Sequence, residues 1–342
     1  MTDAVRPADR ALASGKLPGS LLEHLIETYR TRPDPTVVVS AGYGRDAAAV
    51  TVDPDSLLII KSDPITFTTD NAAHYLIAVN ANDISCLGGV PKWISVVLLL
   101  PEHVTTEPAV EAHFADLQSA ADRLGVSIVG GHTEITSAVT RPVFIGTMLG
   151  VAGPAGLLRP GLARPGDILY LTHSAGIEGT AILARELASP LSAALGPAVV
   201  ERAAALLDSP GIGISTTATL LLETGAITGL HDPTEGGVAT AIHELAAASS
   251  AGAEIDRDRI PTLPETASIC AHFGIDPLGL ISSGALLVAA RPDGTASLDR
   301  AARSHHIPLT RIGVLAPHTS GIHFTSGEPV PRFDSDEITK VL

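Results

Sequence analysis

The sequence predicts an α/β or α+β protein built from two domains, and three observations support this class. The chain has 342 residues, about twice the length of a typical single domain. Strand-like and helix-like patterns alternate along both of its halves. Residues 150–166 form the densest stretch of Pro and Gly, which marks a boundary between the halves. We therefore expect an N-terminal domain over residues 1–152 and a C-terminal domain over residues 163–342.

The first half contains four strand-like runs and two helical patterns. The predicted strands cover residues 57–61, 93–100, 127–129 and 143–149, and the predicted helices cover residues 73–87 and 109–124. In the second helix the apolar residues recur at helical spacing, so that helix should pack on a sheet; they are Val110, Phe114, Leu117, Ala121 and Leu124.

The second half repeats the alternation. Residues 167–172 are predicted as a strand and residues 177–187 as a helix that follows a glycine turn. A second helix over residues 238–248 is opened by Gly236 and Gly237, and residues 285–290 and 311–315 are predicted as strands. No short tandem repeat stands out, which disfavours solenoids and propellers.

Composition describes a folded protein with an aliphatic core. Hydrophobic residues make up 45% of the chain, charged residues 17% and aromatic residues 3%, a balance that excludes a disordered polymer. The 22 Lys and Arg against 37 Asp and Glu give a net charge of −15, which disfavours nucleic-acid binding. A phosphorylated substrate would need divalent cations, helix N-termini or local basic residues to hold it. The negative net charge is thus compatible with a nucleotide enzyme that uses Mg²⁺.

Two further features concern the cell compartment. Cys86 and Cys270 are the only cysteines, too few for a disulfide framework or a Cys-type zinc site. The N-terminus has no apolar segment of the kind a signal peptide needs, and the longest notable apolar run, residues 93–100, has the length of a strand. We expect a cytoplasmic protein without a membrane span.

Four short clusters combine glycine turns with acidic or amide side chains. The first cluster contains Gly44 and Asp46, and the second contains Asp63 directly after a predicted strand. The third contains Asn80, Asn82 and Asp83 on a predicted helix. The fourth contains His132 and Thr133 after another predicted strand. Mg²⁺ takes a few carboxylate oxygens from separate loops, a role that Asp46, Asp63 and Asp83 fit. Each of the three Asp residues could equally be an Asx-turn or helix-cap residue, because none of these tetrapeptides is specific.

The third cluster has the strongest physical argument. Asn80, Asn82 and Asp83 lie within an otherwise apolar helical pattern, where unpaired amides and carboxylates cost several kcal/mol, on the order of 2–7, if they are sequestered. We expect them to face a site.

The second half has a polar cluster at residues 231–237, ahead of a helix. Free N–H groups at a helix start, reached through Gly236 and Gly237, make an anion site that suits phosphate; an ordinary N-cap by Asp232 or Thr234 is the alternative. The segment around Glu178 has the same ambiguity. His132 could be a metal ligand, a general base or simply hydrogen-bonded. Cys86 and Cys270 lie in apolar surroundings, which favours a packing role.

In order and spacing these clusters resemble the aminoimidazole ribonucleotide synthetase superfamily, which includes thiamine-monophosphate kinase, selenophosphate synthetase and the hydrogenase-maturation protein HypE. The similarity runs along nearly the whole chain, and its last two motifs resemble the HypE branch most. The motifs are Gly15-Lys16-Leu17-Pro18, Gly44-Arg45-Asp46-Ala47-Ala48-Ala49-Val50, Ser62-Asp63-Pro64, Val79-Asn80-Ala81-Asn82-Asp83-Ile84, Gly88-Gly89-Val90-Pro91-Lys92-Trp93, Gly130-Gly131-His132-Thr133-Glu134, His231-Asp232-Pro233-Thr234-Glu235-Gly236-Gly237 and Gly274-Ile275-Asp276-Pro277-Leu278.

The resemblance implies a two-domain subunit whose N-terminal sheets pair across a homodimer into a barrel, with ATP and Mg²⁺ near that interface. It implies metal ligation by Asp46, Asp63 and Asp83. It implies catalytic roles for Asp83, His132 and Asp232. The expected nucleotide-binding residues are Lys16, Gly44, Asp46, Asn80, Asn82, Thr133, Thr234, Gly236 and Gly237.

The chain departs from the family pattern at several points. Arg45 replaces the first Asp of the usual Gly-Asp-Asp-Ala-Ala run, and His132 stands where relatives commonly have an acid. Ser283 stands where HypE has an acid before Gly284. HypE carries a C-terminal cysteine that receives a carbamoyl group, whereas this sequence ends at Leu342. Selenophosphate synthesis is disfavoured because no Cys lies in an N-terminal glycine loop.

The leading hypothesis is therefore an ATP-dependent, Mg²⁺-requiring homodimeric enzyme that phosphorylates a small-molecule oxygen, of an amide or carboxamide, toward dehydration or cyclisation. One alternative is a HypE-like maturation partner protein without chemistry of its own. Another is a small-molecule kinase similar to thiamine-monophosphate kinase.

Overall fold

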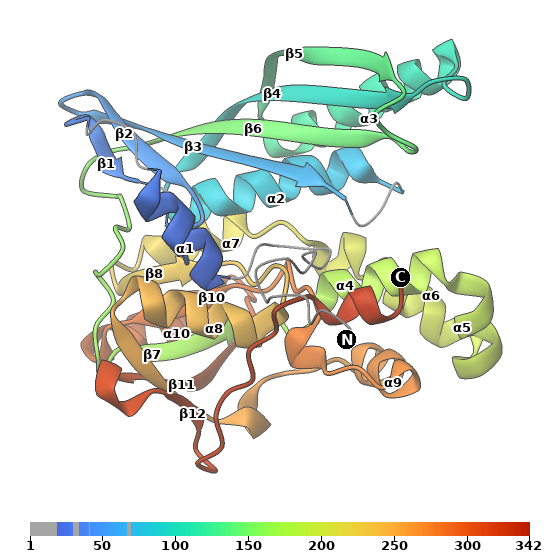
Figure 1. Cartoon of the computed structure of the whole chain (residues 1–342). Helices are drawn as coiled ribbons and strands as arrows, with labels where there is room; N and C mark the ends of the chain where they lie inside the picture. Colours follow the sequence, from blue (N-terminus) through green and yellow to red (C-terminus); the bar gives the residue numbers. More distant parts are fainter. Residues whose placement is uncertain (1–18, 30–33, 41, 67–69) are drawn as a thin grey trace, which may run out of the picture.

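The computed structural model describes residues 19–29, 34–40, 42–66 and 70–342. Two six-stranded sheets, each with helices against it, form an upper and a lower part of the molecule in Figure 1. This is the mixed α/β, two-part architecture that the sequence predicts. Lys16 lies outside the described residues.

The N-terminal sheet has the strand order β1-β2-β3-β6-β4-β5. Its neighbours pair antiparallel except β4 and β5, which are parallel. The strands are β1 (Val37–Val39), β2 (Ala48–Asp53), β3 (Ser56–Ile65), β4 (Val90–Pro101), β5 (Ser127–Thr136) and β6 (Val143–Ala152). The helices of this part are α1 (Gly19–Thr28), α2 (Ala72–Cys86) and α3 (Glu107–Leu124).

Two predicted strands are longer than expected, and both extensions carry candidate residues. β3 continues through Asp63 because β6 pairs with it on one side, with Asp63 opposite Gly146. β5 continues through residues 130–134 because it follows β4 residue by residue, with His132 opposite Val97. Gly131 permits this: a Cβ there would meet the Val96 carbonyl oxygen at 1.9 Å. The residues expected in loops therefore lie within strands.

Helix α2 lies between the two halves (Figure 1). One side packs on the N-terminal sheet through Leu76 and Ile84, whereas Tyr75 and Ala78 pack with side chains of the C-terminal part. A helix that is apolar all round is a buried helix, and nearly every residue of α2 is buried. The polar residues of α2 therefore have to find partners inside the protein.

The C-terminal sheet has the strand order β12-β9-β11-β7-β10-β8, with only the β12–β9 pair parallel. Its strands are β7 (Ile168–Thr172), β8 (Ile227–His231), β9 (Ala251–Ile255), β10 (Leu287–Ala290), β11 (Leu309–Pro317) and β12 (Ile322–Phe324). Its helices are α4 (Ile177–Glu186), α5 (Ala188–Leu195), α6 (Pro197–Ala205), α7 (Ser215–Leu222), α8 (Gly237–Ala248), α9 (Pro264–Phe273) and α10 (Thr295–Ser304).

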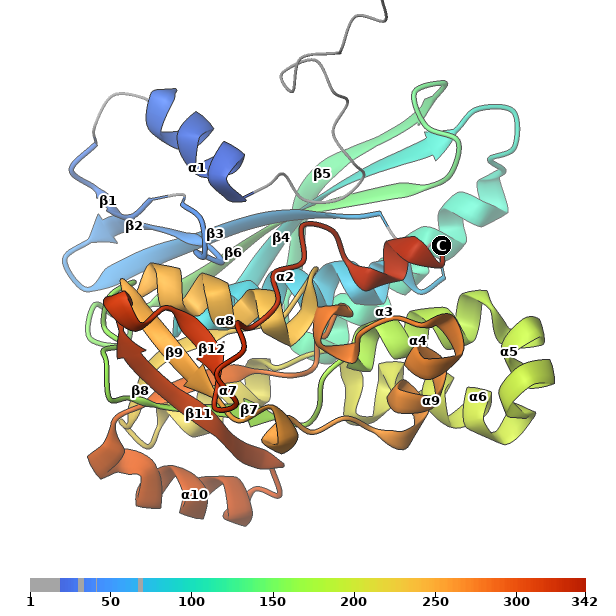
Figure 2. The same cartoon turned by 60° about the horizontal axis from the view of Figure 1, so that its bottom comes forward.

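Helices α4, α5, α6 and α9 gather at one side of this part, and the C-terminal segment crosses the front of the molecule toward them (Figure 2). Short 3₁₀ and π turns connect several of these elements, among them η4 (Pro277–Gly279) and η7 (Glu337–Lys340). The C-terminal segment therefore runs close to α4 and to the region between the two halves.

Both sheets are open within one chain, and β5 is an edge strand of the first. The barrel implied by the family resemblance would need a second copy of the chain, so it stays a prediction. Among the described residues no single helix is long and apolar enough to cross a membrane, although the pair Pro197–Gly211 and Ser215–Leu222, bent by 43°, passes that length and composition test together.

Candidate active site

A cleft of about 880 Å³ opens between the two halves. Its walls come from β3, α2 and the loop before β2 on one side, and from α4, α8 and the C-terminal segment on the other. A volume of roughly 300–1,000 Å³ is usual for ligand sites. The residues that line this cleft include Asp46, Asp63 and Asp83, so the site is described from its carboxylates outward.

The first feature of the cleft is a carboxylate pair held by one lysine. Lys61 and Asp63 lie two residues apart on β3 and so point to the same face of the strand. The Lys61 Nζ lies 3.0 Å from an Asp63 oxygen and 2.9 Å from an Asp83 oxygen of α2. Burial opposes the charge of Lys61, but Asp83 and Asp63 together raise its pKa well above the usual value. Lys61 is therefore a fixed cation between two of the predicted metal ligands.

Asp46 belongs to a second ion-paired set across the cleft. The His231 ring, at the end of β8, places Nδ1 2.5 Å from Asp46 and Nε2 2.8 Å from Glu244 of α8. Burial disfavours a charged ring, yet the two carboxylates outweigh it and raise the pKa of His231 well above its usual value. The N-terminal loop is thus tied to the C-terminal part by an imidazolium between two acids.

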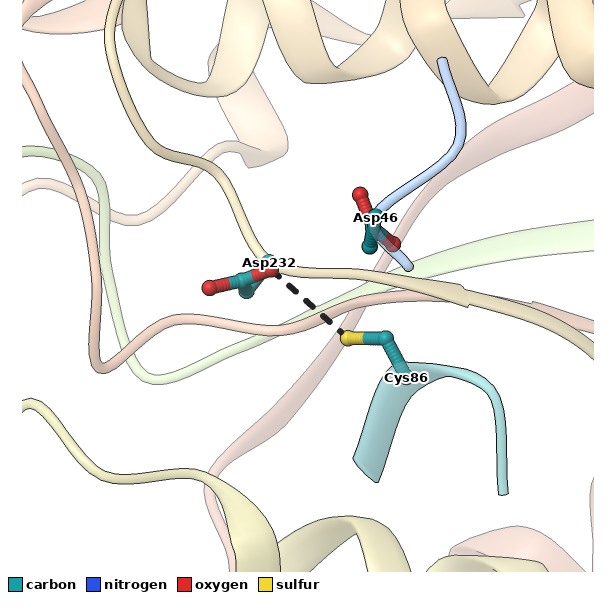
Figure 3. A group of neighbouring side chains, drawn as sticks. All are labelled: Asp46, Cys86 and Asp232. Atoms are coloured by element: carbon teal, nitrogen blue, oxygen red, sulfur yellow. Dashed lines mark hydrogen bonds between the residues drawn. The ribbon is translucent and has the colours of Figure 1, made fainter. Parts of the chain in front are cut away.

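Asp232 lies one residue further along and meets Asp46 and Cys86. One ligand atom from each of these three residues lies within 4.8 Å of the others. Figure 3 shows them converging from three separate segments, with the Cys86 thiol directed at Asp232, 3.8 Å from its Oδ1. Burial and the neighbouring carboxylates raise the pKa of Cys86 well above its usual value. The thiol therefore stays protonated and acts as a donor.

Burial and mutual repulsion act on the central carboxyls. Burial, followed by the charge of Asp46, raises the pKa of Asp232 to about 6. Burial also raises the pKa of Asp83, against the attraction of Lys61. Carboxyls this close cannot all ionise unless a cation compensates them. The cluster therefore favours binding of additional positive charge.

Asn80 and Asn82 of α2 have different partners. Asn80 accepts a hydrogen bond of 3.1 Å from the Asp63 backbone N–H, so it fixes the strand that carries Asp63. Asn82 donates to the Ile212 carbonyl and accepts from the Ile214 N–H, both at 2.9 Å. Asn82 does not line the cleft; its amide joins α2 to the C-terminal part. Both residues are completely buried.

The start of α8 already has a carboxyl partner. The Gly236 N–H donates to an Asp336 oxygen at 2.8 Å, and the other Asp336 oxygen accepts from the Ile338 N–H at 2.9 Å. The place of the anion that the sequence predicts at this helix start is thus taken, at Gly236, by the Asp336 carboxyl of the C-terminal segment. Thr234 and Gly236 line the cleft, whereas the Cβ position of Gly237 is filled by the Leu278 and Leu280 backbone.

A different acid lies deeper along α4. Glu178, in the first turn of that helix, is buried and lines the cleft beside Ser283. Burial raises the pKa of Glu178 to about 8. The sequence signal for this residue was the glycine turn around it, which predicted a helix start without distinguishing a functional acid.

Some predicted residues lie elsewhere. His132 and Thr133 are exposed on β5 and do not line the cleft; the His132 ring lies 3.4 Å from a Glu134 oxygen. Gly44 lies at the cleft, where a positive φ of 71° and the Glu244 carbonyl leave no room for a side chain. Arg45 also lines the cleft, and its guanidinium donates to Ser40.

Comparisons with known proteins fit this architecture. The model for the N-terminal domain of AIR synthase related proteins matches residues 44–152, and the model for their C-terminal domain matches residues 164–324. The chain belongs to the AIR synthase-related family.

Its relatives within the family include HypE proteins. The carbamoyl dehydratase HypE of Rhizobium leguminosarum bv. viciae is 31% identical over 80% of this chain and 77% of its own length. The solved structure of a HypE-HypF complex matches 92% of this chain and 99% of the solved chain, at 22% identity and a TM-score of 0.72. A HypE structure in complex with ATP matches 96% and 98%, at 22% identity and a TM-score of 0.67. The chain falls in the HypE branch.

Proposed function

We propose that this protein is an ATP-dependent enzyme that transfers the γ-phosphoryl group to an amide or carboxamide oxygen of a small molecule, as a step toward dehydration. The observation that carries the proposal is the carboxylate cluster of Asp46, Asp63, Asp83 and Asp232 beside a ligand-sized cleft, in which Asp83 and Asp232 are buried. A HypE relative named carbamoyl dehydratase and a similar HypE fold solved with ATP support it.

Mg²⁺ fits the residues present. Carboxylate oxygens are the ligands that Mg²⁺ prefers, with substrate phosphates and water completing its shell. The ammonium of Lys61 already lies between Asp63 and Asp83 as a single positive charge. Asp63, Asp83 and Asp46 would hold the ion, which would neutralise charge on the nucleotide phosphates. Protonated Cys86 is not a suitable ligand.

The basic residues of the cleft would position the nucleotide. The protein is strongly acidic overall, yet Arg45, Lys61, Arg141 and Arg332 all line this cleft. Guanidinium groups bind phosphate in a bidentate manner. Positioning and charge neutralisation are the main contributions a protein makes to phosphoryl transfer.

The acceptor is proposed to be a separate molecule. Cys86 and Cys270 are the cysteines of the chain, and both are buried. Burial raises the pKa of Cys86 far above its usual value and that of Cys270 to about 12. Neither thiol is therefore available as a nucleophile that carries an acceptor group.

Isothermal titration with a non-hydrolysable ATP analogue, with and without Mg²⁺, tests the nucleotide part. We expect Mg²⁺-dependent binding at a single site per subunit. Failure to bind under either condition would reject the proposal of an ATP-dependent enzyme and favour a maturation partner protein. Recovery of the protein in complex with another maturation protein would favour the same alternative. A HypE-HypF complex exists for a relative of similar fold, and Arg45, His132 and Ser283 depart from the family pattern.

Two isosteric variants test the metal site. Asp83→Asn and Asp63→Asn should each reduce ATP turnover by about 100-fold or more, because charge neutralisation in the transition state is lost, while the fold survives. Asp116→Asn, on the exposed surface of α3, is the matched control and should retain full turnover. Turnover at the wild-type rate in either site variant would remove that residue from the assignment.

We also propose that the chain forms a homodimer through the N-terminal sheet. Every residue of β5 except Thr136 is exposed, and Val129 and Ile135 are 57% and 58% exposed. An open edge strand with apolar side chains favours pairing with a second chain. A small-molecule kinase similar to thiamine-monophosphate kinase remains the alternative reaction, and accumulation of a stable phosphorylated product with ADP would identify it.

A further inference from the structure

Three polar side chains at the α4 side of the cleft have no role in the nucleotide site just described. They are Glu178 of α4, Tyr75 of α2 and Ser283 before β10, and all three line the cleft. Glu178 is 4% exposed and Tyr75 is 2% exposed. Among the described residues, the Glu178 Oε2 and the Tyr75 hydroxyl have no hydrogen-bond partner. Unpartnered buried polar atoms destabilise a protein, so a ligand that satisfies them is the natural explanation.

The backbone holds Glu178 rigidly in place. The Gly176 N–H donates to the Ser282 hydroxyl at 2.7 Å, and the Gly179 N–H donates to the Ile281 carbonyl at 2.9 Å. A side chain at position 179 would meet Leu280 at 2.5 Å, so the helix lies directly on the 280–283 segment. The carboxyl therefore keeps its place beside Ser283 when the cleft is empty.

The charges around Glu178 leave its protonation state sensitive near neutral pH. Burial, with smaller contributions from the carboxylates of Glu235 and Asp336, raises the pKa of Glu178 to about 8, although Ser283 lowers it. Tyr75 stays a neutral donor, because burial and the charge of Glu178 raise the pKa of its hydroxyl. A carboxyl whose pKa lies near the working pH is well suited to proton transfer.

We infer that Glu178, Tyr75 and Ser283 form the acceptor subsite of the cleft, which takes a neutral carboxamide with Glu178 as its proton acceptor. The inference rests on the proposed phosphoryl transfer. A carboxamide presents a carbonyl acceptor next to an N–H donor. The Tyr75 hydroxyl would donate to the carbonyl oxygen, and the Glu178 carboxylate would accept from the nitrogen. A carboxylate ligand would repel Glu178 and offers no N–H.

The proton balance follows from this arrangement. The amide oxygen attacks the γ-phosphorus, the new O–P bond forms, and the bond from that phosphorus to the β,γ-bridging oxygen breaks to release ADP. The amide N–H proton passes to the Glu178 carboxylate, which leaves a neutral C=N bond in the phosphorylated imidate. The ionised form of Glu178 is required, so the rate should rise as pH increases through about 8 and level off above it.

The direct test follows the Glu178 carboxyl by infrared difference spectroscopy on the full-length protein. Wild type at pH about 6.5, below the pKa, should show a neutral carboxylic-acid C=O component, in addition to that of Asp336, that is lost in Glu178→Gln and kept in Glu201→Gln, an exposed control. Acetamide should shift this Glu178 component. If acetamide does not shift the position of the band, the amide subsite is overturned. The same conclusion follows if Glu178→Gln leaves the band unchanged.

A second measurement separates this inference from the proposed function. Glu178→Gln should bind the Mg²⁺–ATP analogue within about twofold of wild type but lose about 100-fold or more in ADP release with acetamide as the probe acceptor, and lose the inflection of the pH profile. Equal rates and equal pH profiles in wild type and variant would overturn the role of Glu178. Absence of nucleotide binding in wild type would instead reject the proposed function. The wild-type band and its titration do not depend on whether the variant folds.

Discussion

Lys61 is the residue that links the two carboxylates of β3 and α2 in the site. It bridges Asp63 and Asp83 at hydrogen-bond distance and is largely enclosed by the cleft wall. A buried carboxylate without a cation is strongly unfavourable, so this lysine stabilises the cluster when no metal is bound. Binding of Mg²⁺ would bring a second cation to the same acids, and Lys61 could then turn toward a phosphate.

Lys61→Met should destabilise the protein and increase its response to Mg²⁺. Removing one partner of an enclosed ion pair leaves Asp83 uncompensated, and we expect the free energy of unfolding to fall by roughly 2–4 kcal/mol. Added Mg²⁺ should raise the melting temperature of Lys61→Met more than that of wild type. Urea unfolding with and without Mg²⁺ measures both effects.

The exposed Lys92 of β4 provides the control for this variant. Lys92→Met should change the free energy of unfolding by less than about 0.5 kcal/mol. Equal stability of wild type and Lys61→Met would show that the lysine does not compensate the acids.

The sequence predicted three acids of the site but not the residues that pair with them. Asp46, Asp63 and Asp83 stood out through their glycine, proline and amide neighbours. Lys61 and His231 were visible in the same motifs, but whether they contact an acid depends on how β3 faces α2 and on how the two halves meet. Neither arrangement follows from periodicity, because each one joins residues far apart in the chain.

At the scale of elements, α2 explains why polar residues are tolerated in an apolar helix. Its two sides face different halves of the molecule, and each buried amide is satisfied by a specific backbone group. The sequence predicted that these residues face a site. Asp83 lines the cleft, whereas Asn82 lies at the junction between the halves.

Asn82→Ala should therefore weaken the junction. The change leaves the Ile212 carbonyl and the Ile214 N–H without partners in a buried region, for an expected loss of about 2–4 kcal/mol in the free energy of unfolding. Chemical denaturation measures this loss. Gln118→Ala, on the exposed face of α3, should change stability by less than about 0.5 kcal/mol, and a similarly small effect for Asn82→Ala would argue against the junction role.

The C-terminal segment is an element whose docking should depend on pH. Burial raises the pKa of Asp336 to about 7, against the backbone N–H groups of Ile338, Gly236 and Ile281 and with a contribution from the charge of Glu235. The usual value for Asp is 3.8, so the docked state binds more protons than the undocked state between these two values. Docking is therefore strongest at low pH and weakens as pH rises toward about 7.

Hydrogen exchange of residues 336–342 measures this docking. After correction for intrinsic exchange, protection should fall as pH rises toward 7, by at most about tenfold per pH unit for one linked proton. Asp336→Asn cannot ionise and should remove that dependence while the N–H groups of α10 keep wild-type protection. A pH dependence that persists unchanged in Asp336→Asn would assign the effect to another group.

Strand extent was the main error of the sequence analysis at this scale. The segment after residue 61 contains Pro64 and the segment after residue 129 contains Gly130 and Gly131, and both were predicted as loops because Gly and Pro usually interrupt strands. Pairing with β6 and β4 overrides that local preference and carries both strands onward. His132 and Thr133 consequently lie on an exposed edge strand.

For the whole molecule, the two-part α/β architecture follows from hydrophobic periodicity on both sides of the Pro/Gly stretch. The relation of one part to the other does not, because it depends on α2 being buried from both sides. The cleft exists only through that arrangement: Asp63 and Asp83 come from one half, and Glu178 and Asp336 come from the other. A single sheet with its helices would carry only part of the candidate site.

The final prediction concerns assembly of two such molecules. Val129 and Ile135 present apolar side chains on the open β5 edge, and a dimer that pairs this edge would bury both of them. Placing a carboxylate at each position, as Val129→Asp with Ile135→Asp, should weaken the dimer by at least about 100-fold, or roughly 2.7 kcal/mol. Size exclusion with light scattering should give twice the 35.1 kDa chain mass for wild type and the single-chain mass for the double variant.

The control for assembly is Val104→Asp, a more exposed apolar residue between β4 and α3, which is 70% exposed. It adds a carboxylate to the loop after β4 and not to β5, so this variant should remain a dimer. A monomeric wild type would contradict the assembly itself. A dimeric double variant would place the interface on another surface, because a buried pair of carboxylates without cations cannot be tolerated at a tightly packed edge.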